Sequence, residues 1–362
     1  MNPAPMQRPL GPASSSTPTP APSDQEVQAC LRTGLRNRWW PILPSRLVAR
    51  GQNPLGLTRL GEPLVVWRDA GGVIHVQTDR CPHRAVPLSR GINEGDRLRC
   101  NYHGVQVSGE GVVLQVPGQP GCPLEGKKAL KTYPSREIAG AIFAWFGDAL
   151  HQEPGDFEPP PQLASDEYSS FLCYVEWDMY WRYLYDNNMD PMHGTFLHAN
   201  SHTMYQGETQ AHFVTRDTEH GFVFEKEGQK DVNFDWSELV DHGALYVRLE
   251  IPYPPSAGPG GNFGIISFGT AIDDERTACF FWRVRRVSGW KRDVWRFLYK
   301  TTIEQRHWAV LEQDREILSG CGPGLERYEM LYQHDAGVIR LRRHLAQQAR
   351  RQLIELKAAG KQ

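Results

Sequence analysis

The first half of the chain alternates short apolar runs with turns rich in Gly and Asp. β-Branched or aromatic runs bounded by such turns occur at Pro63–Trp67, Val73–Gln77 and Ala141–Trp145. Clustered glycines mark the loops, at Gly91–Gly95, Gly109–Gly111 and Gly118–Gly121. Short apolar runs between turn residues are typical of strands, so the pattern predicts a small all-β unit over residues 55–148.

The second half contains longer apolar runs and several helical patterns. Strands are expected at Phe171–Tyr180, Phe222–Lys226, Leu245–Ile251, Phe263–Thr270 and Ala278–Val287. Helices are expected at Trp181–His198, Thr302–Leu318 and Ala336–Leu356. Strands combined with a few helices predict an α+β second domain, and the whole chain is expected to be of the α+β class.

Proline and charge divide the chain into three parts. Residues 1–23 contain seven prolines and few apolar groups, which predicts a disordered tail. A short helical stretch, Asp24–Arg38, should begin the ordered part. The Pro- and acid-rich stretch Glu153–Pro161 is expected to be a linker. We therefore predict a first domain over 24–152 and a second over 153–362.

Length and charge narrow the classes of function. A chain of 362 residues should form about two domains. Lys and Arg total 40 against 42 Asp and Glu, a net charge of −2, which argues against a primary nucleic-acid role. No apolar run is long enough to span a membrane, and no secretory signal is evident. The expected location is the cytoplasm, where paired cysteines are more often metal ligands than disulfides.

Two Cys–His pairs form the first candidate site. Cys81-Pro82-His83 is followed, after sixteen residues, by Cys100-Asn101-Tyr102-His103. Two thiolates and two imidazoles suit a tetrahedral zinc or a two-iron cluster. Each loop supplies one Cys and one His, so two thiolates can hold one iron and two imidazoles the other. This is the Rieske [2Fe–2S] arrangement; a structural zinc is the alternative.

A Met- and Asn-rich stretch supplies a second candidate site. Asp190 and His193 are three residues apart and share a helical face, but His198 lies five residues beyond His193, about 140° round an ideal helix. The helix must therefore end or distort before both imidazoles meet one ion. Non-haem Fe(II) oxygenases use two His and one carboxylate. Core histidines are the alternative interpretation, and His202 is a rival ligand to His198.

Asp314 is the expected carboxylate ligand. Thr302–Leu318 has the pattern of an amphipathic helix, with an apolar stripe formed by Ile303, His307, Val310, Leu311, Ile317 and Leu318. Asp314 falls inside this stripe, whereas Glu312 and Glu316 lie on the opposite face. A buried carboxylate is costly unless it is paired or coordinates a cation. The alternative is that Asp314 pairs with a buried Arg or Tyr.

The Cys–His motif, continued by Tyr102-His103-Gly104, resembles the Rieske domain of the ring-hydroxylating oxygenases. High-potential Rieske proteins carry an extra Cys beside each ligand pair, and this chain has none there. The resemblance therefore implies a low-potential cluster fed from NAD(P)H. Val105 stands where the family commonly has Trp. The Asp190-x-x-His193-x4-His198 pattern and Glu312-Gln313-Asp314-Arg315 resemble the mononuclear iron segments of the smaller family members, which lack a β subunit.

The resemblance implies a small all-β Rieske domain joined to a catalytic domain of antiparallel sheet flanked by helices. Its cofactors would be a [2Fe–2S] cluster on Cys81, His83, Cys100 and His103, and a mononuclear Fe(II) on His193, His198 and Asp314. Asp190 would be catalytic without being a ligand: it would connect His193 to His83 or His103 of a neighbouring subunit by hydrogen bonds. A homotrimer is implied.

The resemblance also implies a terminal oxygenase that uses O₂ to hydroxylate a small organic, aromatic compound. Electrons would come from a separate NAD(P)H-dependent reductase, with or without a ferredoxin, because no G-x-G-x-x-G motif follows a strand. An O- or N-demethylase is the runner-up. A pure electron-transfer module and a zinc hydrolase are the rivals from other classes. The colour of the purified protein separates an iron-cluster protein from a zinc hydrolase, since an iron cluster is red-brown and zinc is colourless.

Overall fold

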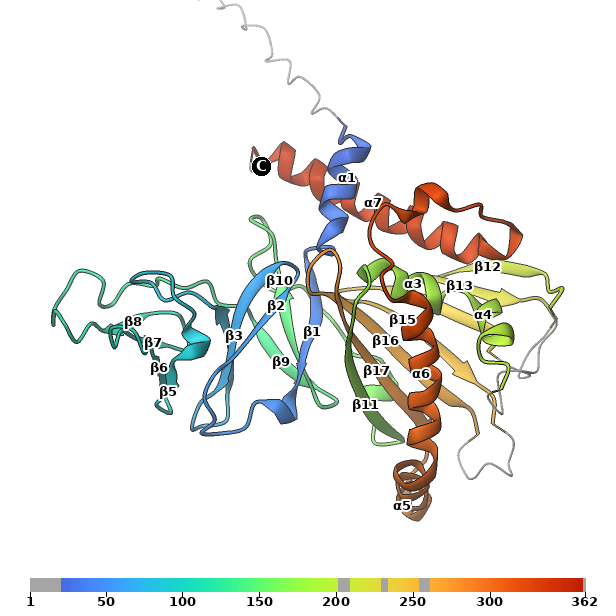
Figure 1. Cartoon of the computed structure of the whole chain (residues 1–362), viewed down its shortest axis with the longest axis horizontal. Coiled ribbons are helices and arrows are strands. Elements are labelled where there is room, and N and C mark those ends of the chain that lie inside the picture. Colours follow the sequence, from blue (N-terminus) through green and yellow to red (C-terminus); the bar gives the residue numbers. More distant parts are fainter. Residues whose placement is uncertain (1–20, 201–208, 229–233, 254–260, 361–362) are drawn as a thin grey trace, which may run out of the picture.

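The computed structural model describes residues 21–200, 209–228, 234–253 and 261–360. Most of the predicted N-terminal tail (residues 1–20) and the rival ligand His202 lie outside the described residues. Figure 1 shows a smaller region of short strands beside a larger region built on one long sheet.

The smaller region contains three small antiparallel sheets. Their strand orders are β1-β10-β9, β2-β3-β4 and β5-β6-β7-β8. The bounds are β1 Arg38–Pro44, β2 Leu55–Arg59, β3 Glu62–Arg68, β4 Ile74–Thr78, β5 Ile92–Asn93, β6 Arg97–Arg99, β7 Gln106–Ser108, β8 Val113–Gln115, β9 Ser135–Ile138 and β10 Ala141–Phe146. This region includes the predicted all-β unit.

The larger region is a seven-stranded antiparallel sheet in the order β11-β17-β16-β15-β14-β13-β12. Its strands are β11 Tyr168–Trp177, β12 Phe213–Thr218, β13 Gly221–Lys226, β14 Trp236–Asp241, β15 Leu245–Ile251, β16 Phe263–Ala271 and β17 Thr277–Arg286. Apart from the edge pairing of β11 with β17, each strand pairs with its neighbour in sequence. Short hairpin connections therefore build most of the sheet.

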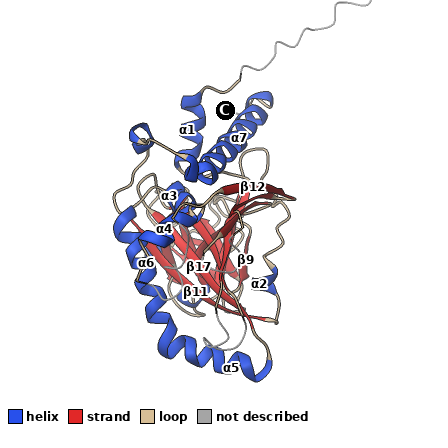
Figure 2. Ribbon diagram, turned by 90° about the vertical axis from the view of Figure 1, so that its right-hand side faces the viewer, coloured by secondary structure: helices blue, strands red, loops and turns tan. Residues whose placement is uncertain are grey.

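Helices flank this sheet: α6 runs along one side of it, and α5 lies across its lower end (Figure 2). The helices are α1 Asp24–Arg32, α2 Pro161–Ala164, α3 Trp181–Asn188, α4 Pro191–Phe196, α5 Gly289–Leu298, α6 Glu304–Leu318 and α7 Ala336–Ala358, with a π-helical turn at Tyr299–Ile303. Short 3₁₀ turns lie at Ser45–Leu47, Leu88–Arg90, Leu325–Tyr328 and Gln333–Asp335. The N-terminal α1 packs against the C-terminal α7.

The two faces of the seven-stranded sheet have different surroundings. Successive residues of a strand point to opposite faces. On β17, Phe280 and Trp282 pack against Phe143 of β10 in one continuous core between the two regions. The alternate residues of the same strand, Phe281 and Arg283, face the other way and line a cavity beneath α6. The first region is thus fixed to one face, and the other face is left to form a site.

Three local predictions need correction. The first helix ends at Arg32, and Trp39 and Trp40 belong to strand β1; Gly34, with φ of 90°, supplies the left-handed residue that commonly ends a helix. The helix predicted over 181–198 is two helices, because Pro191 begins a new one. Strands β1, β12 and β14 and helices α2 and α5 were not predicted, and within residues 55–148 only β3, β4 and β10 were predicted individually.

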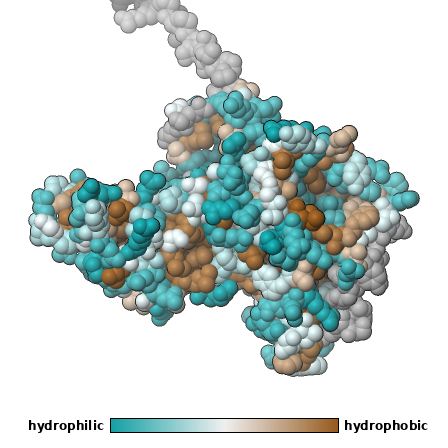
Figure 3. Space-filling view, in the orientation of Figure 1, coloured by the Kyte–Doolittle hydropathy of each residue, from teal (hydrophilic) through white to brown (hydrophobic). Residues whose placement is uncertain are grey.

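The α+β class is confirmed, with a small all-β region followed by an antiparallel sheet flanked by helices. None of the helices in the described ranges is both long and apolar enough to cross a membrane. The end of the molecule at α5 shows apolar surface (Figure 3). There Trp290 is 71% exposed and Phe297 is 68% exposed.

Candidate functional site

The two Cys–His pairs lie on two turns with the same backbone pattern. After β4, the amide of Cys81 donates to the carbonyl five residues on, and the amide of Ala85 donates to the carbonyl of Cys81, both at 2.8 Å. After β6, the amide of Cys100 donates to the carbonyl five residues on at 2.9 Å, and Gly104 donates to Cys100 at 3.0 Å. Ala85 and Gly104 both have positive φ, 55° and 72°. The Cys therefore occupies the same position in both turns, whereas the His lies two residues after Cys81 and three residues after Cys100.

The four side chains are arranged as a two-iron cluster requires, with the two thiols inside and the two imidazoles at the surface. Cys81 and Cys100 are buried and adjacent, whereas His83 and His103 are exposed. The two Nδ1 atoms of the histidines lie 3.1 Å apart. Burial raises the pKa of the Cys81 thiol and the neighbouring Cys100 raises it further, so a bound cation would be needed to hold Cys81 as a thiolate. This donor set fits a [2Fe–2S] cluster with its imidazole side toward solvent.

The second site begins where α3 ends and α4 begins. Asp190 is the N-cap of α4, and its Oδ1 accepts a hydrogen bond from the amide of Met192 at 2.8 Å. Oδ2 of Asp190 lies 3.9 Å from Nδ1 of His193. The Nδ1 atom of His193 also contacts the backbone carbonyl of Asp190. Both contacts hold the His193 ring so that its Nε2 points away from its own helix.

His198 reaches the same site from just beyond α4. The helix ends at Phe196, as the five-residue spacing between the imidazoles requires. The His198 ring is 1% exposed, and its Nδ1 lies 2.9 Å from Oε1 of Gln313 on α6. An amide oxygen only accepts hydrogen bonds, so Gln313 fixes the tautomer with the proton on Nδ1. The lone pair of Nε2 is then left toward the site.

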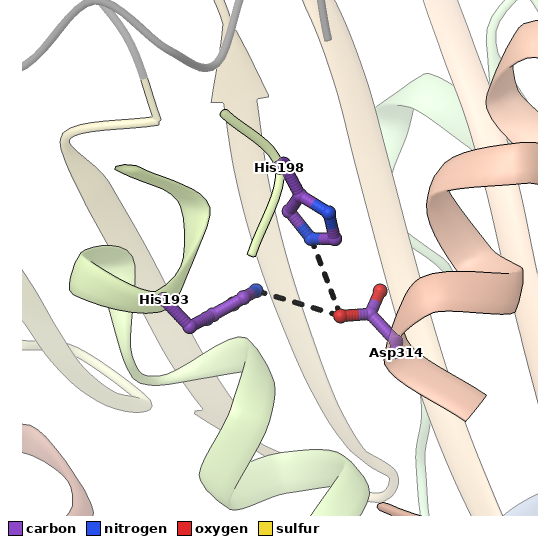
Figure 4. A group of neighbouring side chains, drawn as sticks. All are labelled: His193, His198 and Asp314. Atoms are coloured by element: carbon purple, nitrogen blue, oxygen red, sulfur yellow. Dashed lines mark ion pairs between the residues drawn. The ribbon is translucent and has the colours of Figure 1, made fainter. Parts of the chain in front are cut away.

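Asp314 projects from α6 between the two imidazoles (Figure 4). It is 6% exposed. Its Oδ1 lies 3.2 Å from Nε2 of His198 and 3.7 Å from Nε2 of His193. One ligand-type atom from each of the three residues lies within 4.8 Å of the others. Two imidazoles and one carboxylate facing one point fit a mononuclear Fe(II) with open positions.

The electrostatics at His198 also favour a cation. Burial lowers the pKa of His198, but the hydrogen bond and the charge of Asp314 raise it by more, so the net shift is upward. With the proton of His198 on Nδ1, the lone pair of its Nε2 would face the Asp314 carboxylate, and the two would repel each other. A divalent ion bound by all three would satisfy both lone pairs and the carboxylate together.

A cavity of about 400 Å³ opens beside these three residues, a size typical of small-molecule sites. Its walls come from the sheet face and from α6, and its lining is mostly apolar. The apolar lining residues include Phe234, Leu249, Ile251, Phe263, Ile265, Phe281, Val310 and Leu311. An organic molecule in this cavity would lie next to the metal-type triad.

Some residues of the site had no clear signal in the sequence. Gln313 was noticed only as part of a motif, and Asn187, whose Nδ2 lies 3.4 Å from Asp314 Oδ1, only as a neighbour. His307 lines the cavity and lies 3.1 Å from the Tyr253 hydroxyl. Ile317 is 64% exposed and does not belong to the apolar stripe.

Two family models match the chain. A Rieske [2Fe-2S] domain matches residues 38–134, and a vanillate O-demethylase oxygenase C-terminal domain matches residues 177–351. The first range contains both Cys–His turns. The second contains Asp190, His193, His198 and Asp314.

The chain is also similar to individual proteins. The 5,5'-dehydrodivanillate O-demethylase oxygenase subunit of Sphingobium sp. is 27% identical over 70% of this chain and 59% of the relative. The oxygenase component of dicamba O-demethylase from Stenotrophomonas maltophilia is 33% identical over 47% of this chain and 50% of the relative. The chain spans about half the length of the curated relatives it matches.

Solved structures share the fold across most of the chain. The crystal structure of dicamba monooxygenase bound to dicamba has a TM-score of 0.69 at 19% identity and covers 90% of this chain and 98% of its own. The terminal oxygenase of carbazole 1,9a-dioxygenase from Nocardioides aromaticivorans has the same TM-score and identity, with 90% and 97% covered.

Proposed function

This chain belongs to the Rieske non-haem iron oxygenases, and we propose that it is the terminal oxygenase component of such a system. The observation that carries the proposal is the convergence of His193, His198 and Asp314 beside an apolar cavity. A cluster alone would serve electron transfer. A two-His, one-carboxylate triad next to a cavity for an organic molecule is the arrangement that O₂ activation needs.

When bound, the two iron groups would supply electrons and O₂ chemistry. The residues of the chain would hold these two groups, orient the substrate and enclose it. Cys81, His83, Cys100 and His103 hold the cluster. His193, His198 and Asp314 hold the mononuclear iron. The cavity excludes water from the substrate and places it beside the triad.

The electron path would cross between subunits. The two turns of the cluster site and the triad lie far apart within one chain (Figure 1), whereas His83 and His103 are exposed. In a homotrimer, the exposed imidazoles of one subunit would approach Asp190 of the next. A separate NAD(P)H-dependent reductase, with or without a ferredoxin, would supply the electrons, and the cytoplasm is the expected location.

We propose hydroxylation of a small aromatic compound as the reaction, with O-demethylation as the second candidate. The second candidate is favoured by the vanillate O-demethylase oxygenase C-terminal domain over residues 177–351 and by the O-demethylases among the relatives. Hydroxylating a methoxy group gives a hemiacetal that releases formaldehyde, so both reactions need the same site.

The test uses purified protein with both iron groups and a surrogate reductase. Substituted aromatic compounds, with and without a methoxy group, are scored for substrate-dependent O₂ uptake, oxygenated product and formaldehyde. We expect the protein to be red-brown, and His83→Ala to lose the Rieske spectrum because one of four cluster ligands is gone. A retained spectrum in His83→Ala, or colourless protein with zinc at both sites, would contradict the proposal.

A further inference from the structure

The wall of the cavity includes one buried cation. Arg283 lies on β17, on the face of the sheet that lines the cavity, and is 2% exposed. Its neighbours on this face, Phe281 of β17 and Ile265 of β16, are apolar. A guanidinium is always charged in a protein, so this apolar wall carries a full positive charge.

The guanidinium of Arg283 is only partly satisfied. Its Nη1 donates to the Tyr299 hydroxyl at 2.7 Å, and its Cζ lies 5.3 Å from the ring centre of Trp308. Its Nη2 is buried and has no hydrogen-bond partner. Among the described residues, no carboxylate forms an ion pair with Arg283. A buried charge without a counterion is costly, and an unsatisfied buried donor in a native fold calls for an explanation.

The nearby acids are already engaged. Glu304 at the start of α6 pairs with Lys300 at 2.7 Å. Asp314 lies between the two imidazoles, where a divalent ion would more than neutralise it. Arg306, at an exposed position, also lines the cavity and forms no ion pair with a described residue. The charge around the cavity is therefore positive and uncompensated.

We propose that the cavity takes an aromatic substrate bearing an acid group, a carboxylate or a sulfonate, and that Arg283 binds this group. The inference rests on the proposed function and names its substrate class. An anionic oxygen group would give the guanidinium both a counterion and a charge-assisted hydrogen bond. The rest of the lining would contact the ring.

The geometry also orients the ring. Arg283 lies at the level of Trp308 on α6, six residues before Asp314. A rise of about 1.5 Å per residue places the triad about 9 Å further along the helix axis. One benzene ring with its contacts fills such a gap. The end of the ring remote from the acid group therefore faces the triad, so oxidation is expected there and not beside the acid.

The test compares benzoate with its neutral isostere benzamide by calorimetry on the iron-loaded protein. Benzoate should bind more tightly by about tenfold, the ratio that one hydrogen bond to a charged group supplies. Arg283→Met should remove this preference and Arg283→Lys should retain part of it. Equal binding of the two probes to the unaltered protein would overturn the proposal without recourse to any variant.

Two controls isolate the role of Arg283. Arg285→Lys alters a buried guanidinium two residues along the same strand face, which packs against Trp295 with its Cζ 4.5 Å from the ring centre; the preference for benzoate should persist. Tyr299→Phe removes the hydroxyl partner of Arg283 but leaves its charge, so the preference should again persist. If Arg283→Met keeps the preference, another group binds the acid and the proposal is wrong.

Failure of this inference differs from failure of the proposed function. A protein that oxidises neutral aromatic compounds and ignores benzoate would be an oxygenase without an acid-binding Arg283. A protein that binds benzoate through Arg283 but lacks both iron groups would have the binding site without the proposed activity.

Discussion

At the scale of single residues, Asp314 is the side chain on which the proposed mononuclear site depends. It is the carboxylate of the triad and comes from a different helix than the two imidazoles. Asp314→Ala should lose mononuclear iron and turnover but keep the Rieske spectrum, because no cluster ligand is touched. Iron analysis alongside visible absorption measures both. Glu316→Ala, an exposed acid on the same helix, is the control and should keep its iron; normal mononuclear iron in Asp314→Ala would refute the ligand role.

Gln313 is not a proposed metal ligand; it acts through its hydrogen bond to His198. It holds Nδ1 of that ring at 2.9 Å and so fixes which nitrogen is available to a metal. Partners of this kind are worth about 10–100-fold in metal affinity, so Gln313→Leu should weaken iron binding by that ratio. Gln313→Glu retains an acceptor and should restore most of the affinity. Titration of iron into metal-free protein measures the effect, and an unchanged affinity in Gln313→Leu would exclude the positioning role.

The residues that sequence reasoning identified differ in kind from those that it missed. Asp314 stood out because a carboxylate interrupted an apolar stripe, and burial of a charge needs a reason. Gln313 is uncharged and sits beside it, so nothing in the pattern set it apart. Arg283 lay in a strand of aromatic residues with Arg285 and Arg286 nearby, and only the assembled cavity shows that Arg283 is the one of the three that lines it.

At the scale of elements, Asp241 joins three segments that are far apart in sequence. Its carboxylate accepts hydrogen bonds from Arg38 of β1 at 2.7 and 2.8 Å, and from His344 of α7 at 2.7 Å. Burial raises the pKa of Asp241, but Arg38 and His344 lower it by more, so the pKa lies well below its usual range. The carboxylate thus ties β14 to the first strand and the last helix.

The hydrogen bonds of Asp241 to Arg38 and His344 predict a loss of stability in acid. A carboxyl whose pKa is depressed by folding stabilises the protein above its unfolded pKa of about 3.9, and the contribution is lost as the pH falls below that value. Asp241→Asn should lower the free energy of unfolding at neutral pH by about 3–5 kcal/mol, because Arg38 stays buried without its counterion. Urea unfolding across pH 2–7 measures both effects. Glu167→Gln, in an exposed pair with Arg286, should change little; equal losses in the two variants would contradict the prediction.

Element boundaries were predictable where a local signal exists. The strands at Leu245–Ile251 and Phe263–Ala271 came within a residue of their expected bounds, since β-branched and aromatic runs mark them. Strand β12, Phe213–Thr218, has mostly exposed side chains and therefore no apolar run. Helix α5 has apolar residues at helical spacing, Trp290, Val294 and Phe297, so its pattern was available in the sequence, although the structure leaves these side chains exposed.

At the scale of the whole molecule, the proposed electron path would depend on how subunits meet. Asp190 caps α4 with one oxygen, and its other oxygen lies 3.9 Å from His193. Asn is as good an N-cap as Asp, so Asp190→Asn separates the cap from the charge. Both iron groups should still bind, but electron delivery to the mononuclear iron should slow steeply.

Single-turnover reoxidation of the pre-reduced cluster measures this step, with iron content determined on the same sample. Asp190→Ala is the companion variant: it removes the cap as well and should cost about 1 kcal/mol of stability in addition. Reoxidation at the wild-type rate with full iron occupancy in Asp190→Asn would rule the bridge out. Loss of iron would instead make Asp190 a ligand.

The alternation of side chains along the central strands has a consequence for engineering. On β15, β16 and β17 the cavity is lined by odd-numbered residues, Leu249, Ile251, Phe263, Ile265, Phe281 and Arg283. The even-numbered Ile266, Phe268, Phe280 and Trp282 form the core against the first region. A mutant library restricted to the odd positions could vary substrate preference while leaving the attachment of the cluster-bearing region intact. Insertion of a single residue in β17 would exchange the two sets beyond that point, and would damage specificity and assembly together.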